Sequence, residues 1–365
     1  MAQGRRGCGC VLAALVGVLV VGGVVGWHFF KPWWQQYRAR QLPAPSGKEL
    51  QVHALDVGLG DSILIVAPSG KTALVGAGPP GAGKKVLDAF KRLGVDHVDL
   101  FVATNAHADH IGGAADVFKA LNVGQVVYSG YPQTTREYED FLKAVKEKNV
   151  ALVKAAPGQT VDLGDGAILS VLAPTEPFFD VKDLSAGGNE PNANSVVMRL
   201  DYGEFSMLLA GDAEEQTERR MFEKGANLSA EVLKVAHHGS KYATSADFLK
   251  RGGFHWAVLS TGADNRYGLP SPETLERLKA AGVKLFRTDL QGEITISTRG
   301  QKDDVKITAA REPKMGQDIW AGLQALRDDS AKRGFINYGD LPPAPKQTPP
   351  RANTNRNANS RAGAR

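Results

Sequence analysis

The sequence predicts an α/β protein in which two β-sheets carry helices on their outer faces, preceded by one hydrophobic segment. From about residue 50 onward, segments in which apolar and polar residues alternate are interspersed with segments of helical periodicity. Such a mixture favours two packed sheets with helices outside them. In addition, residues 11–30 form an apolar run, and three of the predicted strands end in histidine or aspartate.

Local patterns give the individual elements of this fold. Alternation predicts strands at 50–57 and 61–68, and apolar content predicts strands at 71–78 and 98–105. Further strands are expected at 124–129, 167–172, 195–201 and 205–210, and helices at 83–93, 136–148, 213–224, 245–251 and 272–281. Ser271 before Pro272 is a typical start for the last of these helices, because serine caps a helix and proline fits its first position.

Charge is distributed unevenly along the 365 residues. The chain carries a net charge of +5, but residues 1–48 contribute +6 and residues 341–365 contribute +5, which leaves −6 for residues 49–340. The basic isoelectric point therefore comes from the two ends. This balance disfavours strong nonspecific nucleic-acid binding by the folded region.

The apolar run at 11–30 (VLAALVGVLVVGGVVGWHFF) has the length of a membrane-spanning helix, for which about 20 residues are needed. Arg5 and Arg6 precede it and predict a cytoplasmic N-terminus. We therefore expect a single-pass protein of the bacterial inner membrane whose domain faces the extracytoplasmic side. A cleaved signal peptide is the alternative, but the run is long and leads into bulky residues instead of a small-residue cleavage site.

The chain divides into segments of different composition. We expect a cytoplasmic N-terminus at 1–10, a transmembrane anchor at 11–30, a linker at 31–49, a folded domain at 50–310, a peripheral segment at 311–340 and a disordered basic tail at 341–365. The tail could contact phosphates or simply increase solubility. Cys8 and Cys10, the two cysteines of the chain, precede the anchor, so the folded domain has no disulfide and no cysteine ligand for a metal.

Ligand-type residues follow three predicted strands. The segment 103–113 (ATNAHADHIGG) presents His107, Asp109 and His110 where a buried strand ends. Histidine and carboxylate are ligands that zinc, manganese and iron share. Taken alone, this segment could be a surface loop whose aspartate caps a helix. However, LLAGD ends a strand at Asp212 and VLKVAHHGS ends another at the pair 237–238, which favours a shared metal site.

These segments resemble the metallo-β-lactamase superfamily, and most closely the hydrolase domain of ComEC-type DNA-uptake proteins. The resemblance covers about residues 50–298 and rests on five segments in the same order: LDVGLGDSILI, NAHADHIGG, NANSVVMRLDYGEFSMLLAGDAE, VLKVAHHGSKYATS and DNRYGLPSPETLERL. It implies an αββα sandwich with the metal site along one edge. It also implies metal-dependent hydrolysis, of phosphodiesters in nucleic acid or nucleotides.

The resemblance also implies roles for single residues. The implied ligands are His107 for a first metal, Asp109, His110 and His237 for a second, and Asp212 as the bridge between them. Asp109 and Asp212 would also orient the attacking water or take its proton. His238 is expected beside the site and not as a ligand. Lys241 could contact a phosphate or carboxylate of the substrate, or be an ordinary solvated lysine.

Three positions depart from the family pattern. Asn105 stands where the family has a histidine ligand, Gly76 where it has an aspartate, and Leu269 where it has a histidine near the substrate. The first-metal ligands are thus depleted while the second-metal ligands are complete. We therefore expect one tightly bound divalent metal, Zn²⁺ or Mn²⁺, because three or four protein ligands and water suffice for a catalytic metal.

Two functions remain open from the sequence. The first is a membrane-anchored metal-dependent hydrolase, with a nucleic acid or nucleotide as substrate and the membrane as its other partner. The second is a catalytically degenerate protein that uses the fold as a binding or scaffold module, which the three departures favour. The retained ligand set favours the enzyme, and the sequence indicates no particular protein partner.

Overall fold

The computed structural model describes residues 46–184, 188–263 and 265–332. The predicted anchor at 11–30, most of the predicted linker, and the predicted tail at 341–365 lie outside the described residues. Within the part of the chain that is described, no helix is both long enough and apolar enough to cross a bilayer.

The first sheet has eight strands, in the spatial order β15-β14-β1-β2-β3-β4-β5-β6. Its strands are β1 (Leu50–Ala54), β2 (Ile63–Val66), β3 (Thr72–Val75), β4 (His97–Ala103), β5 (Asn122–Tyr128), β6 (Ala151–Lys154), β14 (Ile294–Thr298) and β15 (Lys306–Ala309). The pairs from β3 to β6 are parallel, and the pairs from β15 to β3 are antiparallel.

The second sheet has seven strands, in the order β13-β12-β11-β10-β9-β8-β7. Its strands are β7 (Thr160–Gly164), β8 (Ala167–Ala173), β9 (Val197–Tyr202), β10 (Phe205–Leu209), β11 (Val232–Lys234), β12 (Trp256–Leu259) and β13 (Lys284–Arg287). The strands β10 to β13 are parallel, so their carboxyl ends meet at one edge of the sheet. A residue that follows any of these strands is therefore brought close to that edge.

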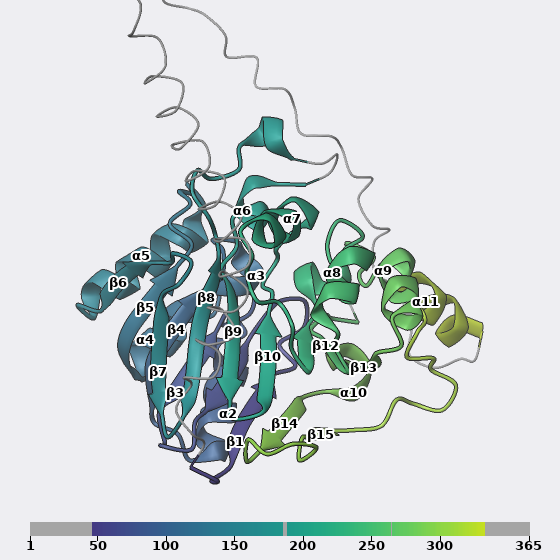
Figure 1. Ribbon diagram of the computed structural model, residues 1–365, viewed down its shortest axis with the longest axis horizontal. Helices are drawn as coiled ribbons and strands as arrows, with labels where there is room; N and C mark the ends of the chain where they lie inside the picture. Colours follow the sequence, from purple (N-terminus) through teal and green to yellow (C-terminus); the bar gives the residue numbers. More distant parts are fainter. Residues whose placement is uncertain (1–45, 185–187, 264, 333–365) are drawn as a thin grey trace, which may run out of the picture. The chain divides into compact units, whose positions relative to one another are not determined.

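Helices connect the strands and cover the outer faces. They are α2 (Gly83–Leu93), α3 (Ala108–Ile111), α4 (Ala114–Ala120), α5 (Arg136–Glu147), α6 (Glu190–Ala193), α7 (Glu215–Glu223), α8 (Ala246–Gly252), α9 (Pro272–Ala280), α10 (Thr288–Gln291) and α11 (Leu323–Lys332), with 3₁₀ turns η1 (Val181–Asp183) and η2 (Ala236–Gly239). Figure 1 shows α8, α9 and α11 beside β12 and β13.

Three apolar layers hold these elements together. Alternate side chains of the two sheets, such as Val52 and Leu100 from the first and Leu200 and Met207 from the second, form the layer between the sheets. A second layer lies between the first sheet and α2, α4 and α5, and a third lies between the second sheet and α7, α8 and α9. The predicted sandwich of two sheets with helices outside them is therefore confirmed.

The predicted strands and helices up to residue 281 are found within a few residues of their expected bounds. The sequence did not predict β6, β7, β12, β13, β14 or β15. The exposed pattern of β6 explains its omission, because three of its four residues face solvent and give no hydrophobic alternation. In the predicted peripheral segment 311–340, the described part contains α11.

Candidate metal site

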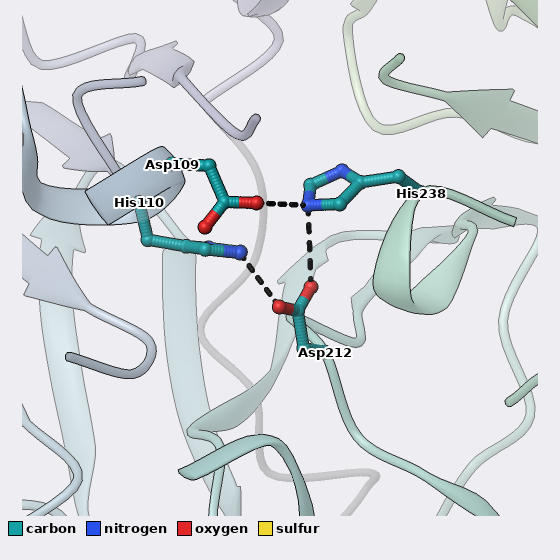
Figure 2. Close-up of side chains that lie close together, drawn as sticks. All are labelled: Asp109, His110, Asp212 and His238. Carbon is teal, nitrogen blue, oxygen red and sulfur yellow. Dashed lines mark ion pairs between the residues drawn. The ribbon is translucent and has the colours of Figure 1, made fainter. Parts of the chain in front are cut away.

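Four ligand-type side chains converge at the edge where strands of both sheets end. Asp109, His110, Asp212 and His238 each offer one nitrogen or oxygen atom, and these four atoms all lie within 4.8 Å of one another (Figure 2). The described residues contain no other group of three or more such side chains at this spacing.

Both sheets contribute to this cluster. Asp109 and His110 lie in α3, which follows β4 of the first sheet. Asp212 follows β10 and His238 lies in η2, which follows β11, and both strands belong to the second sheet. The parallel strands β10 and β11 are neighbours, so the residues that follow them are brought together at one edge.

Both imidazole rings of the cluster are held by a contact at Nδ1. His110 Nδ1 lies 2.8 Å from the hydroxyl of Thr104, and His238 Nδ1 lies 3.0 Å from the backbone carbonyl of Ser260. The carbonyl can only accept, so His238 carries its hydrogen on Nδ1 when the ring is neutral. A contact of this kind fixes the tautomer and ring orientation of a metal-ligating histidine.

The Nε2 atoms of the two rings point at the carboxylates (Figure 2). His110 Nε2 lies 2.8 Å from Asp212 Oδ2. His238 Nε2 lies 3.2 Å from Asp109 Oδ2 and 3.6 Å from Asp212 Oδ1. Despite these short distances, His110 Nε2, His238 Nε2 and Asp212 Oδ1 are buried without a hydrogen-bond partner of acceptable geometry.

Such an arrangement fits a metal ion. Buried polar atoms without hydrogen bonds cost free energy, so their convergence on one point requires a reason. Two imidazole nitrogens and two carboxylate oxygens are a donor set for zinc or manganese. The Asp109 side chain is 28% exposed while the other three are at most 1% exposed, so water reaches the cluster from the Asp109 side.

When no metal is bound, the attraction between the two imidazoles and the two carboxylates outweighs the effect of burial on their pKa values. Burial alone would lower the pKa of His110, but Asp212 and Asp109 outweigh it and raise this pKa to about 9. Burial is likewise outweighed for His238, whose pKa is raised mainly by Asp212. Burial alone would raise the pKa of Asp212, but His110 and His238 hold it well below its usual range. A metal would therefore displace protons from the imidazoles as it binds.

The structure places His238, and not His237, in the cluster, which differs from the sequence expectation for these two residues. His237 Nε2 instead lies 3.1 Å from Asn192 Nδ2, and its Nδ1 lies 3.7 Å from a Glu214 carboxylate oxygen. Both histidines have left-handed backbone angles, with φ of 48° and 51°. This conformation is rare in residues other than glycine, and no sequence pattern indicated it.

His107 also lies outside the four-residue cluster. It precedes α3, and its backbone N–H donates to the Asn105 side-chain oxygen at 2.9 Å. Burial lowers the pKa of His107, partly offset by Asp109 and Asp212. His107 therefore remains near the cluster without joining it, and its predicted role as a ligand stays a prediction.

The structure shows the contacts of the three positions that depart from the family pattern. Asn105 is buried, and its Nδ2 donates to Asp212 Oδ2 at 3.1 Å and to Ser195 at 3.3 Å. Gly76 has φ of +71°, and a Cβ atom there would lie 2.3 Å from the Asp61 carbonyl oxygen. Leu269 is half-buried and its carbonyl accepts a hydrogen bond from the Asn265 side chain.

Lys241 is exposed, and its ammonium group lies 5.3 Å from the centre of the Tyr242 ring. It is not part of the four-residue cluster. The predicted contact of Lys241 with a substrate phosphate or carboxylate therefore stays a prediction.

The sequence missed a buried ion pair directly behind the cluster. Asp61 Oδ1 lies 2.8 Å from Lys234 Nζ and 3.5 Å from His238 Nδ1, and both side chains of the pair are 1% exposed. Asp61 belongs to the segment LDVGLGDSILI that carries the resemblance, but an aspartate between two strands more often indicates a turn. Lys234 is a single charge at the end of a strand, which gives no signal of burial.

Comparison with known proteins agrees with this geometry. Residues 55–262 match the family model described as the metallo-beta-lactamase superfamily. ComE operon protein 3 of Bacillus subtilis is 30% identical over 67% of this chain and 33% of its own length. Competence protein ComA of Neisseria gonorrhoeae is 29% identical over 71% of this chain and 33% of its own length. The chain thus spans about a third of the length of these curated relatives.

Solved structures resemble the chain more distantly. A metallo hydrolase from the archaeon Ignicoccus hospitalis, Igni18, has a TM-score of 0.43 and 15% identity, and the match covers 69% of this chain and 99% of the other. A metallo-β-lactamase from Cronobacter sakazakii has a TM-score of 0.35 and 15% identity, covering 50% and 75% of the two chains. Such values are too low to indicate a shared substrate.

Proposed function

Since the chain belongs to the metallo-β-lactamase superfamily, we propose that it is a metal-dependent hydrolase with one tightly bound divalent metal, Zn²⁺ or Mn²⁺. The observation that carries this proposal is the convergence of Asp109, His110, Asp212 and His238. These four residues would hold the metal. His238 takes the place that the sequence had given to His237, because its Nε2 faces both carboxylates.

A single metal is favoured by the contacts of Asp212. One of its oxygens, Oδ2, already accepts a hydrogen bond from Asn105, which stands where the family has a histidine ligand. The Asn105 amide thus occupies a lone pair of the carboxylate that the resemblance gives as the bridge between two metals. An amide binds a transition metal far more weakly than imidazole, so a second tight site is not expected.

The reaction proposed for this site is the attack of water on a phosphodiester. A metal held by these four residues would lower the pKa of a bound water and would offset negative charge that develops on the substrate. Asp109 is the most exposed side chain of the cluster and faces the entry of solvent, so it orients the water for attack. In the metal-free protein burial alone would raise the pKa of Asp109, but the charges of His110 and His238 outweigh it and hold this pKa well below its usual range, so the carboxylate is ionised and ready to bind a metal.

The substrate class and the location rest on the relatives. The relative from Neisseria gonorrhoeae is named a competence protein, and a third relative from Haemophilus influenzae, 26% identical, is named Recombination protein 2. These names support a nucleic acid or nucleotide as substrate. The apolar run at 11–30 supports a single anchor in the bacterial inner membrane, with the domain on the extracytoplasmic side.

The full-length chain, purified in detergent, tests this proposal. We expect about one metal ion per chain by elemental analysis, and hydrolysis of bis-p-nitrophenyl phosphate and single-stranded DNA with added Zn²⁺ or Mn²⁺. Asp109→Ala should lower the rate by at least about 100-fold, because it weakens metal binding and removes the group that orients the attacking water. Absence of both metal and turnover would contradict the proposal, and two tightly bound metals would contradict the single site.

A catalytically degenerate binding or scaffold module is the second candidate. The Asn105–Asp212 hydrogen bond favours it, because a side chain that cannot replace imidazole occupies a ligand position. Stoichiometric metal without turnover on either substrate would support this second function. Turnover that Asp109→Ala abolishes would exclude it.

A further inference from the structure

We propose that Asp61 is a positioning residue for His238, and that Lys234 is the buried counter-ion that balances the Asp61 charge. This inference rests on the proposed metal site, because it assigns Asp61 the task of aiming a metal ligand. Neither residue belongs to the four-residue cluster, and both are buried beneath it.

The ion pair joins the two sheets behind the cluster. Asp61 lies between β1 and β2 of the first sheet, and Lys234 is the last residue of β11 in the second sheet. Lys234 Nζ lies 2.8 Å from Asp61 Oδ1 and also donates to the Val235 carbonyl at 2.8 Å. Since η2 follows β11 directly, the pair fixes the base of the turn that carries His238.

A carbonyl oxygen and a carboxylate oxygen lie on the same side of the His238 ring, next to Nδ1. Its Nδ1 lies 3.0 Å from the Ser260 carbonyl oxygen and 3.5 Å from Asp61 Oδ1. The Ser260 carbonyl accepts from Nδ1, which keeps the hydrogen there and directs the Nε2 lone pair at Asp109 and Asp212, and the Asp61 charge on the same side favours the same arrangement. A nearby carboxylate also makes the imidazole a stronger electron donor to a metal.

The backbone of Asp61 makes hydrogen bonds to the segments around the cluster. Its N–H donates to the Asp109 carbonyl at 3.1 Å, and its carbonyl accepts from the Gly78 N–H at 2.9 Å. A Cβ atom at Gly76 would lie 2.3 Å from that same carbonyl oxygen. A side chain at 76 would therefore require the backbone at Asp61 to shift, and with glycine there Asp61 is the carboxylate next to His238 Nδ1.

Stability alone does not explain a buried ion pair. Apolar side chains of similar volume often give equal or greater stability than a buried pair, because removing two charges from water is costly. The pair touches a ring whose orientation decides metal binding. We therefore infer that the Asp61–Lys234 pair orients the His238 ring.

The experiment compares two double variants that each remove one negative and one positive charge. Asp61→Asn with Lys234→Met removes the pair behind His238. Asp201→Asn with Arg199→Met is the matched control, because this pair on β9 has a 2.7 Å contact, nearly buried side chains and no member in the four-residue cluster. The affinity of the full-length chain for Zn²⁺ is measured by competition with a chromophoric chelator, and the melting temperature is measured without metal.

We expect Asp61→Asn/Lys234→Met to bind Zn²⁺ about 10- to 100-fold more weakly than wild type, as found when a residue that orients a ligand is removed. The control should keep wild-type affinity whatever its melting temperature. In the Co²⁺-loaded protein, the visible absorption bands should change only in the first variant. If the methionine variant does not fold, Asp61→Asn/Lys234→Gln offers a neutral hydrogen-bonding pair in its place.

The outcomes separate the two proposals. If wild type binds Zn²⁺ and the Asp61/Lys234 double variant binds it within twofold of wild type, the pair is structural and the positioning role is overturned. If both double variants lose stability but neither loses affinity, the same conclusion follows. If wild type itself binds no Zn²⁺, Mn²⁺ or Co²⁺, the proposed metal site fails, and the inference fails with it.

Discussion

At the scale of the residue, the adjacent histidines 237 and 238 have different surroundings although the sequence does not distinguish them. His238 is 1% exposed and faces Asp109 and Asp212, whereas His237 is 20% exposed and faces Asn192. Both positions have a left-handed backbone, so consecutive side chains leave the chain in a tight turn at this point. Strained backbone of this kind persists where the surrounding structure requires it, and it gathers at functional sites.

Single alanine substitutions test this assignment. We expect His238→Ala to weaken Zn²⁺ binding by at least about 100-fold, because it removes one of four ligands. His237→Ala should keep the affinity within a few-fold of wild type, since His237 lies outside the cluster. Chelator competition measures both values. If His237→Ala loses the metal and His238→Ala keeps it, the expectation from the sequence is the correct one.

Gly76 offers a second test at this scale. Gly76→Ala should destabilise the protein for two reasons: its φ of +71° strains an alanine by about 1–2 kcal/mol, and the new Cβ would lie 2.3 Å from the Asp61 carbonyl oxygen. Gly58→Ala is the matched control, because Gly58 has φ of +86° and an added Cβ atom there would have no neighbouring atom within 4 Å. Urea unfolding should show the larger loss for Gly76→Ala, and equal losses would contradict the close contact.

At the scale of the element, the sequence predicts what local periodicity and capping determine. The strand β4 and the helix α9 were predicted because their burial patterns and the Ser271 cap depend on residues nearby in the chain. The exposed edge strand β6 was missed because its pattern has no apolar alternation. The Asp61–Lys234 pair was missed for a different reason: its two residues lie far apart in the chain and meet only when the two sheets pack.

Helix α7 contains a buried carboxylate that supports the segment before α8. Glu218 is 1% exposed, and it accepts the backbone N–H groups of Thr244 at 2.6 Å and Ser245 at 3.1 Å. Burial raises the pKa of Glu218 from its ordinary 4.5 to about 7, although the hydrogen bonds from Ser245 and Thr244 oppose this rise. The folded state therefore binds a proton at Glu218 more tightly than the unfolded state.

This shift predicts a pH-dependent stability. Because the pKa of Glu218 is higher in the folded state, its contribution is fully present below about pH 4.5, falls as pH rises toward about 7, and is constant above that. The change amounts to at most about 3 kcal/mol. Urea unfolding of wild type and Glu218→Gln across this range should show the wild type losing stability relative to the variant. Parallel curves would show that Glu218 does not titrate in this window.

At the scale of the whole molecule, the candidate site joins the two sheets. Asp109 and His110 follow a strand of the first sheet, and Asp212 and His238 follow strands of the second. The sequence predicted that these strand ends carry ligands, because each ligand is adjacent to its own strand. Which side chains meet across the two sheets depends on packing between distant segments, and no local pattern contains that information.

A metal bound to ligands from both sheets should stabilise the whole fold, because it binds the folded state and not the unfolded chain. At a free Zn²⁺ concentration 100 times the dissociation constant, the free energy of unfolding should rise by about 2.7 kcal/mol. Thermal unfolding of the full-length chain with Zn²⁺ and with a chelator measures the difference, which should increase with metal concentration. In Asp109→Ala the rise in melting temperature with Zn²⁺ should be much smaller than in wild type, because one of the four ligands is lost. A shift in Asp109→Ala as large as in wild type would place the metal elsewhere on the molecule.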